Sequence, residues 1–255
     1  MSMSQNDALF RYLLRLADTC SVMSHRLSEW CGHGPILEED IALSNIALDL
    51  IGQARLFYQY AGEIEGKGRD EDQLAMTRPE RDYNNLLMVE QPNGDYGETM
   101  ARQFLFDSFN LLLMRELTRS SDQRIREIAE KGVKEVTYHR RHSMSWVIRM
   151  GDGTEESHKR VQNGLTKVWG FTDEFFIMDD VDRMMADAGI GPDLEALSAP
   201  WEADVKAVLA EATLQEPNVE WRVVGGRHEG KHTEYLGFIL AEMQYMQRSY
   251  PGLEW

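Results

Sequence analysis

The sequence is poor in positive charge. Its 255 residues include 27 lysines and arginines against 43 aspartates and glutamates, which gives a formal net charge of -16 at pH 7. Affinity for nucleic acids and anionic membranes comes largely from cationic side chains that neutralise phosphates. We therefore expect no nucleic acid and no membrane among the partners of this chain. Hydrophobic residues still make up 42% of it, enough for a packed globular protein.

Long apolar runs and cysteines are also scarce. No stretch approaches the ~18 consecutive apolar residues of a membrane-spanning helix, and the N-terminal MSMSQNDALF lacks the basic and apolar regions of a signal peptide. These features predict a cytoplasmic location. Cys20 and Cys31 fall in one expected helix about three turns apart, which is too far for a disulfide. We expect both to be reduced thiols.

Apolar residues instead recur with a period near 3.6, which indicates amphipathic helices. The pattern predicts four long helices over about 8–31, 37–65, 96–119 and 122–150, with a short one within 79–92. Further helices are expected over about 154–176, with a shorter piece ending at 189, and over 200–212 and 232–250. In the last, the expected inward-facing residues are Leu236, Ile239, Met243 and Met246. The expected N-caps are Ser121 or Asp122, Thr154 and Thr233. Only WRVV, residues 221–224, could form a strand.

The fold class is therefore all-α. The first two long helices form one hairpin and the next two form another of similar length, and paired hairpins joined by a long crossover are typical of a four-helix bundle. No linker is visible in the sequence. We expect a single domain over 1–255, with a core bundle over about 8–150 and extra C-terminal helices over about 154–250.

Three carboxylates interrupt the apolar stripes of these helices. Asp49, Asp107 and Glu135 each have neighbours three, four and seven positions away that are expected to point into the core. Burying a carboxylate costs free energy unless a partner compensates. A single such residue is readily explained by a hydrogen-bond donor in the core. Three of them on three helices raise the question of a metal site.

The ligand set for such a site is incomplete. A dinuclear carboxylate site in a ferritin-like bundle takes one Glu from each of two helices and Glu-x-x-His from each of the other two. Here Asp49 is followed at i+3 by Gly52, and Glu135 by Tyr138. On the first helix Asp18 lies off the face that would carry a ligand. We therefore expect a degenerate site without metal.

Two interpretations of the remaining polar residues stay open. In KEVTYHRRH, His139 and His142 follow Glu135 at i+4 and i+7, so a single ion could be held by Glu135, His139 and Asp107. The i+4 position is rotated by ~100° from i+3, which argues against a simple replacement of the missing ligand. The favoured interpretation is a core hydrogen-bond network in which His139 or His142, and Gln53, satisfy the acids.

Long stretches of the chain carry a resemblance to a known family. They are SHRLSEWCGHGPILEEDIALSNIALDLIGQAR, NNLLMVEQPNGDYGETMARQ, KEVTYHRRHS and GGRHEGKHTEYLGFILAEMQYMQR. Together they cover the four long helices and the C-terminal one. In these stretches the chain closely resembles the PaaC-type structural subunit of the bacterial phenylacetyl-CoA epoxidase.

The resemblance implies a ferritin-like fold and a non-catalytic role. It implies a PaaA-type partner subunit that carries the di-iron site and epoxidises the ring of phenylacetyl-CoA in aerobic phenylacetate catabolism, with no cofactor in the present chain. The alternative is a catalytically active di-metal oxidase or oxygenase of ferritin-like fold. Since exposed apolar surface on an isolated subunit normally becomes covered, we also expect a homodimer when the partner is absent.

The segment GGRHEGKHT resembles a phosphate-binding loop, G-x-x-x-x-G-K-[ST], but places His232 where the loop needs a hydroxyl. Without a parallel sheet such a loop has no scaffold, so nucleotide hydrolysis is not expected. Arg227 and Lys231 remain candidates for contact with a partner or with a CoA phosphate.

Overall fold

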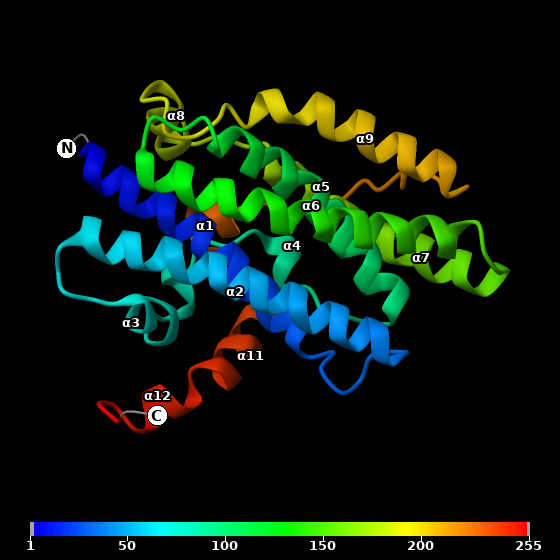
Figure 1. Ribbon diagram of the computed structural model, residues 1–255, viewed down its shortest axis with the longest axis horizontal. Helices are drawn as coiled ribbons and strands as arrows, with labels where there is room; N and C mark the ends of the chain where they lie inside the picture. Colours follow the sequence, from blue (N-terminus) through cyan, green and yellow to red (C-terminus); the bar gives the residue numbers. More distant parts are fainter. Residues whose placement is uncertain (1–2, 254–255) are drawn as a thin grey trace. The chain divides into compact units, whose positions relative to one another are not determined.

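The computed structural model describes residues 3–253 and forms two compact units. Unit 1 contains residues up to Pro92 together with the segment from Gly225 onward, and unit 2 is Asn93–Val224. Regular structure within residues 3–253 is entirely helical (Figure 1). The all-α prediction is confirmed, and the helices are consistent with a ferritin-like bundle. The expectation of one domain over 1–255 stays a prediction.

Unit 1 is built on a hairpin of two long helices, α1 (Gln5–Ser28) and α2 (Leu37–Glu65) (Figure 1). Ser4 caps α1 by accepting a 3.1 Å hydrogen bond from the backbone N–H of Asp7. Gly66 ends α2 in the left-handed conformation, with φ of 67°, which glycine adopts without strain. The predicted bounds of α2 are confirmed, whereas those of α1 were three residues late at both ends.

Shorter elements complete unit 1. They are α3 (Glu71–Met76), the 3₁₀ turn η1 (Glu80–Asp82), α4 (Leu87–Glu90), α10 (Gly226–Glu229), α11 (Glu234–Met243) and α12 (Tyr245–Ser249). The sequence did not predict α3 or α10. The predicted helix over 232–250 is broken at Gln244, whose Nε2 donates to the carbonyl of Arg78 at 3.0 Å and to the hydroxyl of Tyr83 at 2.9 Å. Met246 follows this break and is 41% exposed, so its inward placement was wrong.

Unit 2 is built on a second hairpin, α5 (Tyr96–Leu117) and α6 (Gln123–Gly151). Asp122 caps α6 and Thr154 caps α7 (Glu155–Val168), as predicted. The chain then tightens into the 3₁₀ segment η2 (Trp169–Phe175) instead of continuing as α-helix. It continues through α8 (Asp180–Asp187), η3 (Glu195–Leu197) and α9 (Ser198–Glu211).

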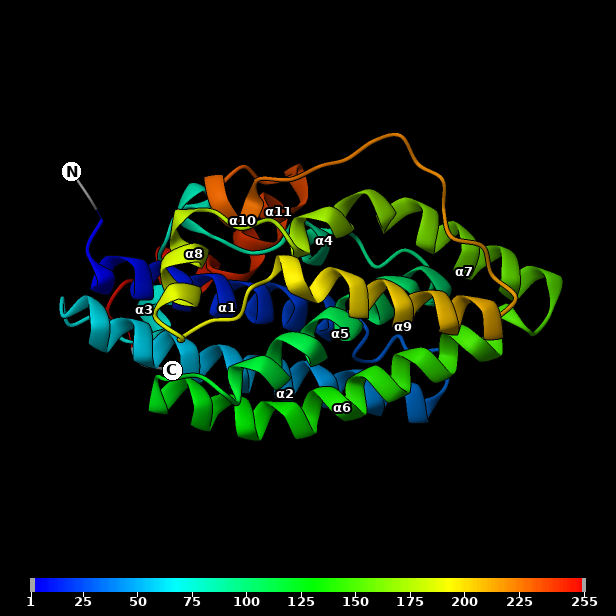
Figure 2. The ribbon, with the colours of Figure 1, turned by 90° about the horizontal axis from the view of Figure 1, so that it is seen from above.

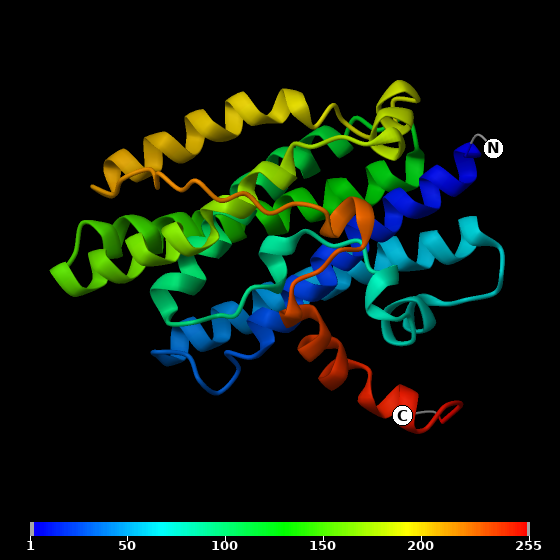
Figure 3. The same ribbon diagram turned by 180° about the vertical axis from the view of Figure 1, so that it is seen from behind.

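The segment after α9 runs back beside α7 and η2 (Figure 2, Figure 3). Gln215 N donates to Gln162 Oε1 at 2.9 Å, and Val223 N donates to the carbonyl of Gly170 at 3.1 Å. A Cβ on Gly170 would lie 2.1 Å from the Trp221 ring, so this close approach requires glycine. Residues 221–224 therefore form an extended strap rather than the strand that the sequence allowed.

The apolar core of unit 2 is rich in aromatic rings. Phe109 stacks on Phe175 with ring centroids 4.6 Å apart, and Trp201 meets Phe175 edge-on at 5.9 Å. The indole N–H of Trp201 donates to the carbonyl of Leu105 at 3.1 Å. This bond satisfies the polar atom of a side chain that otherwise contributes apolar area, and it ties α9 to α5.

Cys20 is buried and Cys31 is exposed, and neither is in a disulfide, as expected. No helix within residues 3–253 combines the length and apolar character that crossing a bilayer requires.

Candidate functional site

Asp107 is the one predicted core acid that the structure buries completely, with 0% of its surface exposed. It lies on α5, and both of its carboxylate oxygens accept hydrogen bonds. Gln103, one turn earlier, donates to Oδ1 at 2.7 Å, and Ser143 of α6 donates to Oδ2 at 2.8 Å. Burial raises the pKa of Asp107, against the opposing effect of His139 and of these two donors.

The two donors that bond to Asp107 were not predicted from the sequence. The sequence pointed to His139 or His142, and to Gln53, as the groups that satisfy the acids. His139 is buried in unit 2 and lowers the pKa of Asp107 through its charge, and Gln103 and Ser143 each donate a hydrogen bond to the carboxylate. The interpretation that His139 or His142, and Gln53, satisfy the acids stays a prediction. Gln103 stands at i-4 from the acid, which is a signal that the sequence contains.

The other residues of KEVTYHRRH point in different directions from α6. Glu135 is half-buried, with its side chain 20% exposed and Lys131 Nζ at 3.9 Å. Tyr138, at the position where a histidine ligand would stand, is 40% exposed. Its ring lies 6.1 Å from that of His142, which is half-buried. The expectation that Glu135 points into the core was therefore wrong in part.

In unit 1, the candidate ligand positions Asp49 and Gly52 of α2 do not have the environment that a metal site needs. Asp49 is half-buried rather than in the core. A Cβ on Gly52 would meet no described atom within 4 Å. Gln53 is buried, and its Oε1 accepts a long hydrogen bond of 3.9 Å from the Sγ of Cys20. Among these residues, the contact of Gln53 with Cys20 links α2 to α1, the two helices of the hairpin.

The donor set does not fit a dinuclear iron centre. Residues 52 and 138 supply no imidazole, and both oxygens of Asp107 are occupied by neutral donors. Within the described part of unit 2, no three of Asp107, Glu135, His139 and His142 bring ligand atoms within 4.8 Å of one another.

The structure also shows a buried ion pair that the sequence did not reveal. Asp18, interpreted above as lying off the important face of its helix, is 0% exposed. Its carboxylate pairs with Arg78, accepts from the hydroxyl of Tyr58 at 2.6 Å, and accepts from the backbone N–H of Asn84 at 2.8 Å. Burial and the charge of Asp18 raise the pKa of Tyr58, so this phenol remains a protonated donor.

A second buried carboxylate, Glu90, fastens the start of α11 to α4. Oε2 accepts from the backbone N–H of Thr233 at 2.8 Å and from its hydroxyl at 2.6 Å, and Oε1 accepts from Asn85 at 2.8 Å. His232 lies with Nδ1 at 2.5 Å from Oε1 and Nε2 at 2.9 Å from the carbonyl of Tyr83. Burial alone would lower the pKa of His232, but the carboxylate of Glu90 raises it. The hydroxyl of Thr233 is thus engaged by Glu90 and does not cap α11 as predicted.

Comparison with known proteins identifies the family. The family described as phenylacetic acid catabolic protein matches residues 1–255. The chain belongs to this family. A curated relative, the C-type subunit of 1,2-phenylacetyl-CoA epoxidase from Escherichia coli (strain K12), is 49% identical over 247 residues, which cover 97% of this chain and 99% of the relative. The resemblance inferred from the helical stretches is confirmed.

In this family member, GGRHEGKHT does not form the strand, loop and helix of a phosphate-binding loop. Gly225 and Gly230 have positive φ angles of 122° and 62°, and the four-residue α10 lies between them. No strand precedes it in the described chain. Arg227 is buried, with 5% exposure, whereas Lys231 is exposed and pairs with Glu229. Contact of Arg227 and Lys231 with a partner or a CoA phosphate stays a prediction, and only Lys231 is placed on the surface.

The buried state of Asp107 makes a prediction for this family member. Because its pKa is raised, the folded state is favoured by protonation, and that contribution is lost as pH rises through the folded-state pKa. Asp107→Asn removes the buried charge, so we expect the variant to exceed the wild type in unfolding free energy by about 1 kcal/mol at neutral pH. The difference should shrink as the pH is lowered from 7 through the raised folded-state pKa, because the wild-type carboxyl then becomes protonated in the folded state. Urea unfolding followed by circular dichroism over this pH range measures it.

Asp152→Asn is the matched control, because Asp152 is exposed at the end of α6. It should change stability little at any pH. If Asp107→Asn were clearly less stable than the wild type at neutral pH, the interactions of the carboxylate with His139, Gln103 and Ser143 would outweigh the cost of its burial, and the prediction would be wrong.

Proposed function

We propose that this chain is the non-catalytic structural subunit of a phenylacetyl-CoA epoxidase complex in aerobic phenylacetate catabolism, paired with a PaaA-type subunit that holds the di-iron centre. The observation that carries the proposal is the 49% identity to the C-type subunit of the E. coli enzyme over nearly the full length of both chains. A cytoplasmic location accompanies the proposal. The di-iron cofactor belongs to the partner and the chain itself carries none.

The residues at the degenerate ligand positions support a non-catalytic role for this chain. Gly52 and Tyr138 stand where histidines would be needed, and Asp107 is satisfied by Gln103 and Ser143. A carboxylate with both oxygens engaged by neutral donors in a core is what remains when a site serves packing rather than coordination.

Exposed apolar side chains support a role in assembly. The outer face of α2 presents Leu37, Ile41 and Leu48, which are 71%, 50% and 66% exposed. The C-terminal helices add Phe238 of α11 at 66% and Tyr245 of α12 at 61%. Large apolar side chains that gather on one face usually mark contact surfaces. We propose that such surfaces are covered by the PaaA-type partner in the complex, and by a second copy in a homodimer when the partner is absent.

Iron analysis tests the proposal against an active di-metal oxidase or oxygenase. We expect the chain purified alone to contain far less than one iron per chain after mild chelation. Co-expressed with a PaaA-type subunit, it should elute with that subunit in size-exclusion chromatography, and the iron should follow the partner. Chelation-resistant iron near two per chain in the isolated protein, lost in Asp107→Asn, would establish the oxidase instead. Failure of the PaaA-type subunit to co-purify would count against the structural role.

A further inference from the structure

His232 is the residue of GGRHEGKHT that interrupts the phosphate-loop pattern, and its imidazole is completely buried in unit 1. Both ring nitrogens have partners. Nδ1 lies 2.5 Å from Oε1 of Glu90, and Nε2 lies 2.9 Å from the backbone carbonyl oxygen of Tyr83. A neutral imidazole carries one N–H, whereas an imidazolium carries two. The number of N–H groups that these two contacts need therefore decides the protonation state of the ring.

Both partners of the His232 ring are acceptors. The carbonyl of Tyr83 can only accept. The carboxylate of Glu90 also accepts from Asn85 at Oε1 and twice from Thr233 at Oε2, so with the ring all of its about four acceptor positions are engaged. Two N–H groups are needed, which is one proton more than a carboxylate and a neutral imidazole hold together. This extra proton lies in the 2.5 Å bond between Nδ1 and Oε1, where the two groups titrate as one pair.

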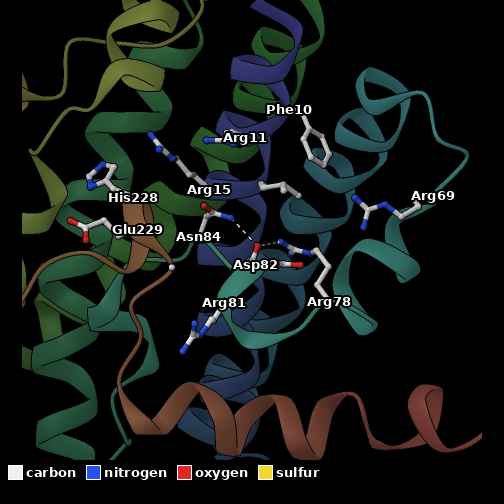
Figure 4. Close-up of a pocket in the computed structure, with 12 residues that line it drawn as sticks. Phe10, Arg11, Arg15, Arg69, Arg78, Arg81, Asp82, Asn84, His228 and Glu229 are labelled. Carbon is white, nitrogen blue, oxygen red and sulfur yellow. Dashed lines mark hydrogen bonds between the residues drawn. The ribbon is translucent and has the colours of Figure 1, made fainter. Parts of the chain in front are cut away.

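Both acceptors are held in place by other parts of unit 1. The backbone carbonyl of Glu90 accepts from Nε and Nη2 of Arg26 at 3.0 and 2.7 Å, which ties α4 to α1. The segment before α4 is fixed through the carbonyl of Asp82, which accepts from Arg78 at 2.7 Å and from Asn84 at 2.9 Å (Figure 4). A ring that loses the extra proton therefore turns a nitrogen lone pair toward one of two fixed oxygens, and a buried hydrogen bond is lost.

The helix α11 is attached at both ends, and the two attachments differ in chemistry. At its start, Thr233 follows His232 directly and donates to Glu90 through its backbone N–H and its hydroxyl. At its end, the side-chain amide of Gln244 donates to the hydroxyl of Tyr83 at 2.9 Å. An amide does not titrate, and burial raises the pKa of the Tyr83 phenol. Of the two attachments, the one at the start therefore responds to pH near neutrality.

We propose that Glu90, His232 and Thr233 form a pH-sensitive latch, which holds the start of α11 while the extra proton is bound and loosens it when that proton is lost. Burial acts against protonation of the ring, but the Glu90 carboxylate outweighs it, so the pKa of His232 lies above its ordinary value of 6.5. Stability from a raised pKa is fully present below the unfolded-state value and is lost as pH rises through the folded-state value. The latch is therefore closed below pH 6.5 and opens on the alkaline side.

Further charged and titratable groups surround the latch. Residues 18–26 of α1, which bond to residues 84–90, contribute Asp18, His25 and Arg26. The chain around η1 contributes Arg78, Glu80, Arg81 and Asp82, and the segment that carries the latch contributes His228, Glu229, Lys231 and Glu234.

Among these groups, the charges on α1 leave Glu90 in control of the ring. Asp18 raises the pKa of His232 further but contributes less than Glu90, and it is itself paired with Arg78. Burial lowers the pKa of His25, so that ring is neutral throughout the range in which the latch titrates. The protonation of His232 therefore follows its contact with the Glu90 carboxylate.

The latch controls a segment with a large apolar content. Leu236, Ile239 and Leu240 of α11 are buried, and Phe238 is 66% exposed. Loosening the start of α11 frees these side chains from their fixed positions. Since Phe238 is among the residues proposed above to contact a partner, assembly is expected to weaken as the latch opens. That consequence rests on the proposed function, whereas the latch itself does not.

Nitrogen-15 NMR of the full chain with labelled histidines tests the protonation state. The His232 signals are identified by their absence from His232→Gln. We expect two protonated ring nitrogens at about pH 6 and the loss of one proton with a midpoint above 6.5. A midpoint at or below 6.5 would overturn the proposal.

Hydrogen–deuterium exchange between about pH 6 and about pH 9 tests the opening. After correction for the intrinsic exchange rate, the protection of amides 233–237 should fall by up to about tenfold per pH unit between 6.5 and the NMR midpoint, because each opening then releases one proton. His232→Gln should remove this dependence, since its amide does not titrate. Protection that stays constant with pH in the wild type contradicts the latch.

Two histidine variants are the matched controls. His33→Gln makes the same substitution at an exposed position of unit 1, and His228→Gln makes it four residues earlier in the same segment. Both should keep the wild-type pH profile. A profile that persists in His232→Gln, or that disappears in His228→Gln, overturns the proposal. If His232→Gln fails to fold, the wild-type exchange profile and the NMR midpoint, with the ring assigned through Glu90→Gln, still decide.

Discussion

Arg78→Met is expected to destabilise the protein by about 3–5 kcal/mol, since it leaves a buried carboxylate without its cation. Asp18 is 0% exposed and Arg78 is 3% exposed, so water cannot replace the lost partner. Arg78 also donates to the carbonyl of Asp82 at 2.7 Å and lies 4.3 Å from the ring centroid of Tyr83. The substitution therefore removes several restraints on the segment between α3 and α4. Urea unfolding at neutral pH, followed by circular dichroism, gives the free-energy change.

Two further variants show whether the buried charge causes the loss. Adding Asp18→Asn to Arg78→Met should restore part of the stability, because the unpaired charge is removed while hydrogen bonds from Tyr58 and Asn84 remain possible. Arg183→Met breaks an ion pair with Glu195 in which both side chains are 57% exposed, and should cost less than about 1 kcal/mol. An Arg78→Met loss no larger than that of Arg183→Met would contradict the role assigned to the buried pair.

The long helices could be predicted from the sequence because their signals are local. The apolar period and the caps Asp122 and Thr154 act within one or two turns, and the structure confirms them. The errors occur where a distant group decides the outcome. Gln244 breaks the C-terminal helix while its side chain bonds to Arg78 and Tyr83, more than 150 positions earlier in the chain.

The site was predictable only in part, for a related reason. The stripe on α5 correctly identified Asp107 as a buried acid, because the apolar neighbours that bury it lie on the same helix. The same reasoning passed over Asp18, since it assumed that α1 has one buried face. The structure buries α1 on nearly every side, including Arg15, Asp18 and Ser21, so position on a stripe carries no information there.

Glu90→Ala is expected to loosen the C-terminal segment and to lower the unfolding free energy by at least about 3 kcal/mol. Glu90 is 0% exposed, and its carboxylate accepts from Asn85, from His232, and twice from Thr233. Truncation leaves the donors of His232 and Thr233 without this acceptor, and each buried donor left unpaired costs about 1–3 kcal/mol. Hydrogen–deuterium exchange should show faster exchange of amides from Thr233 through α11, beyond the change expected from global stability alone.

Two control variants, Glu90→Gln and Glu242→Ala, test whether the effect of Glu90→Ala comes from the lost carboxylate. Glu90→Gln retains one carbonyl oxygen but presents an amide N–H₂ to the remaining donors, so its effect should lie between those of the wild type and Glu90→Ala. Glu242→Ala removes an exposed carboxylate from α11 itself and should leave exchange at Thr233 unchanged. Because α11 packs on α1, α4 and η1, a segment released at its first residue loses these contacts together. Unchanged exchange in Glu90→Ala would mean that apolar packing of Leu236 and Leu240 holds α11 without the carboxylate.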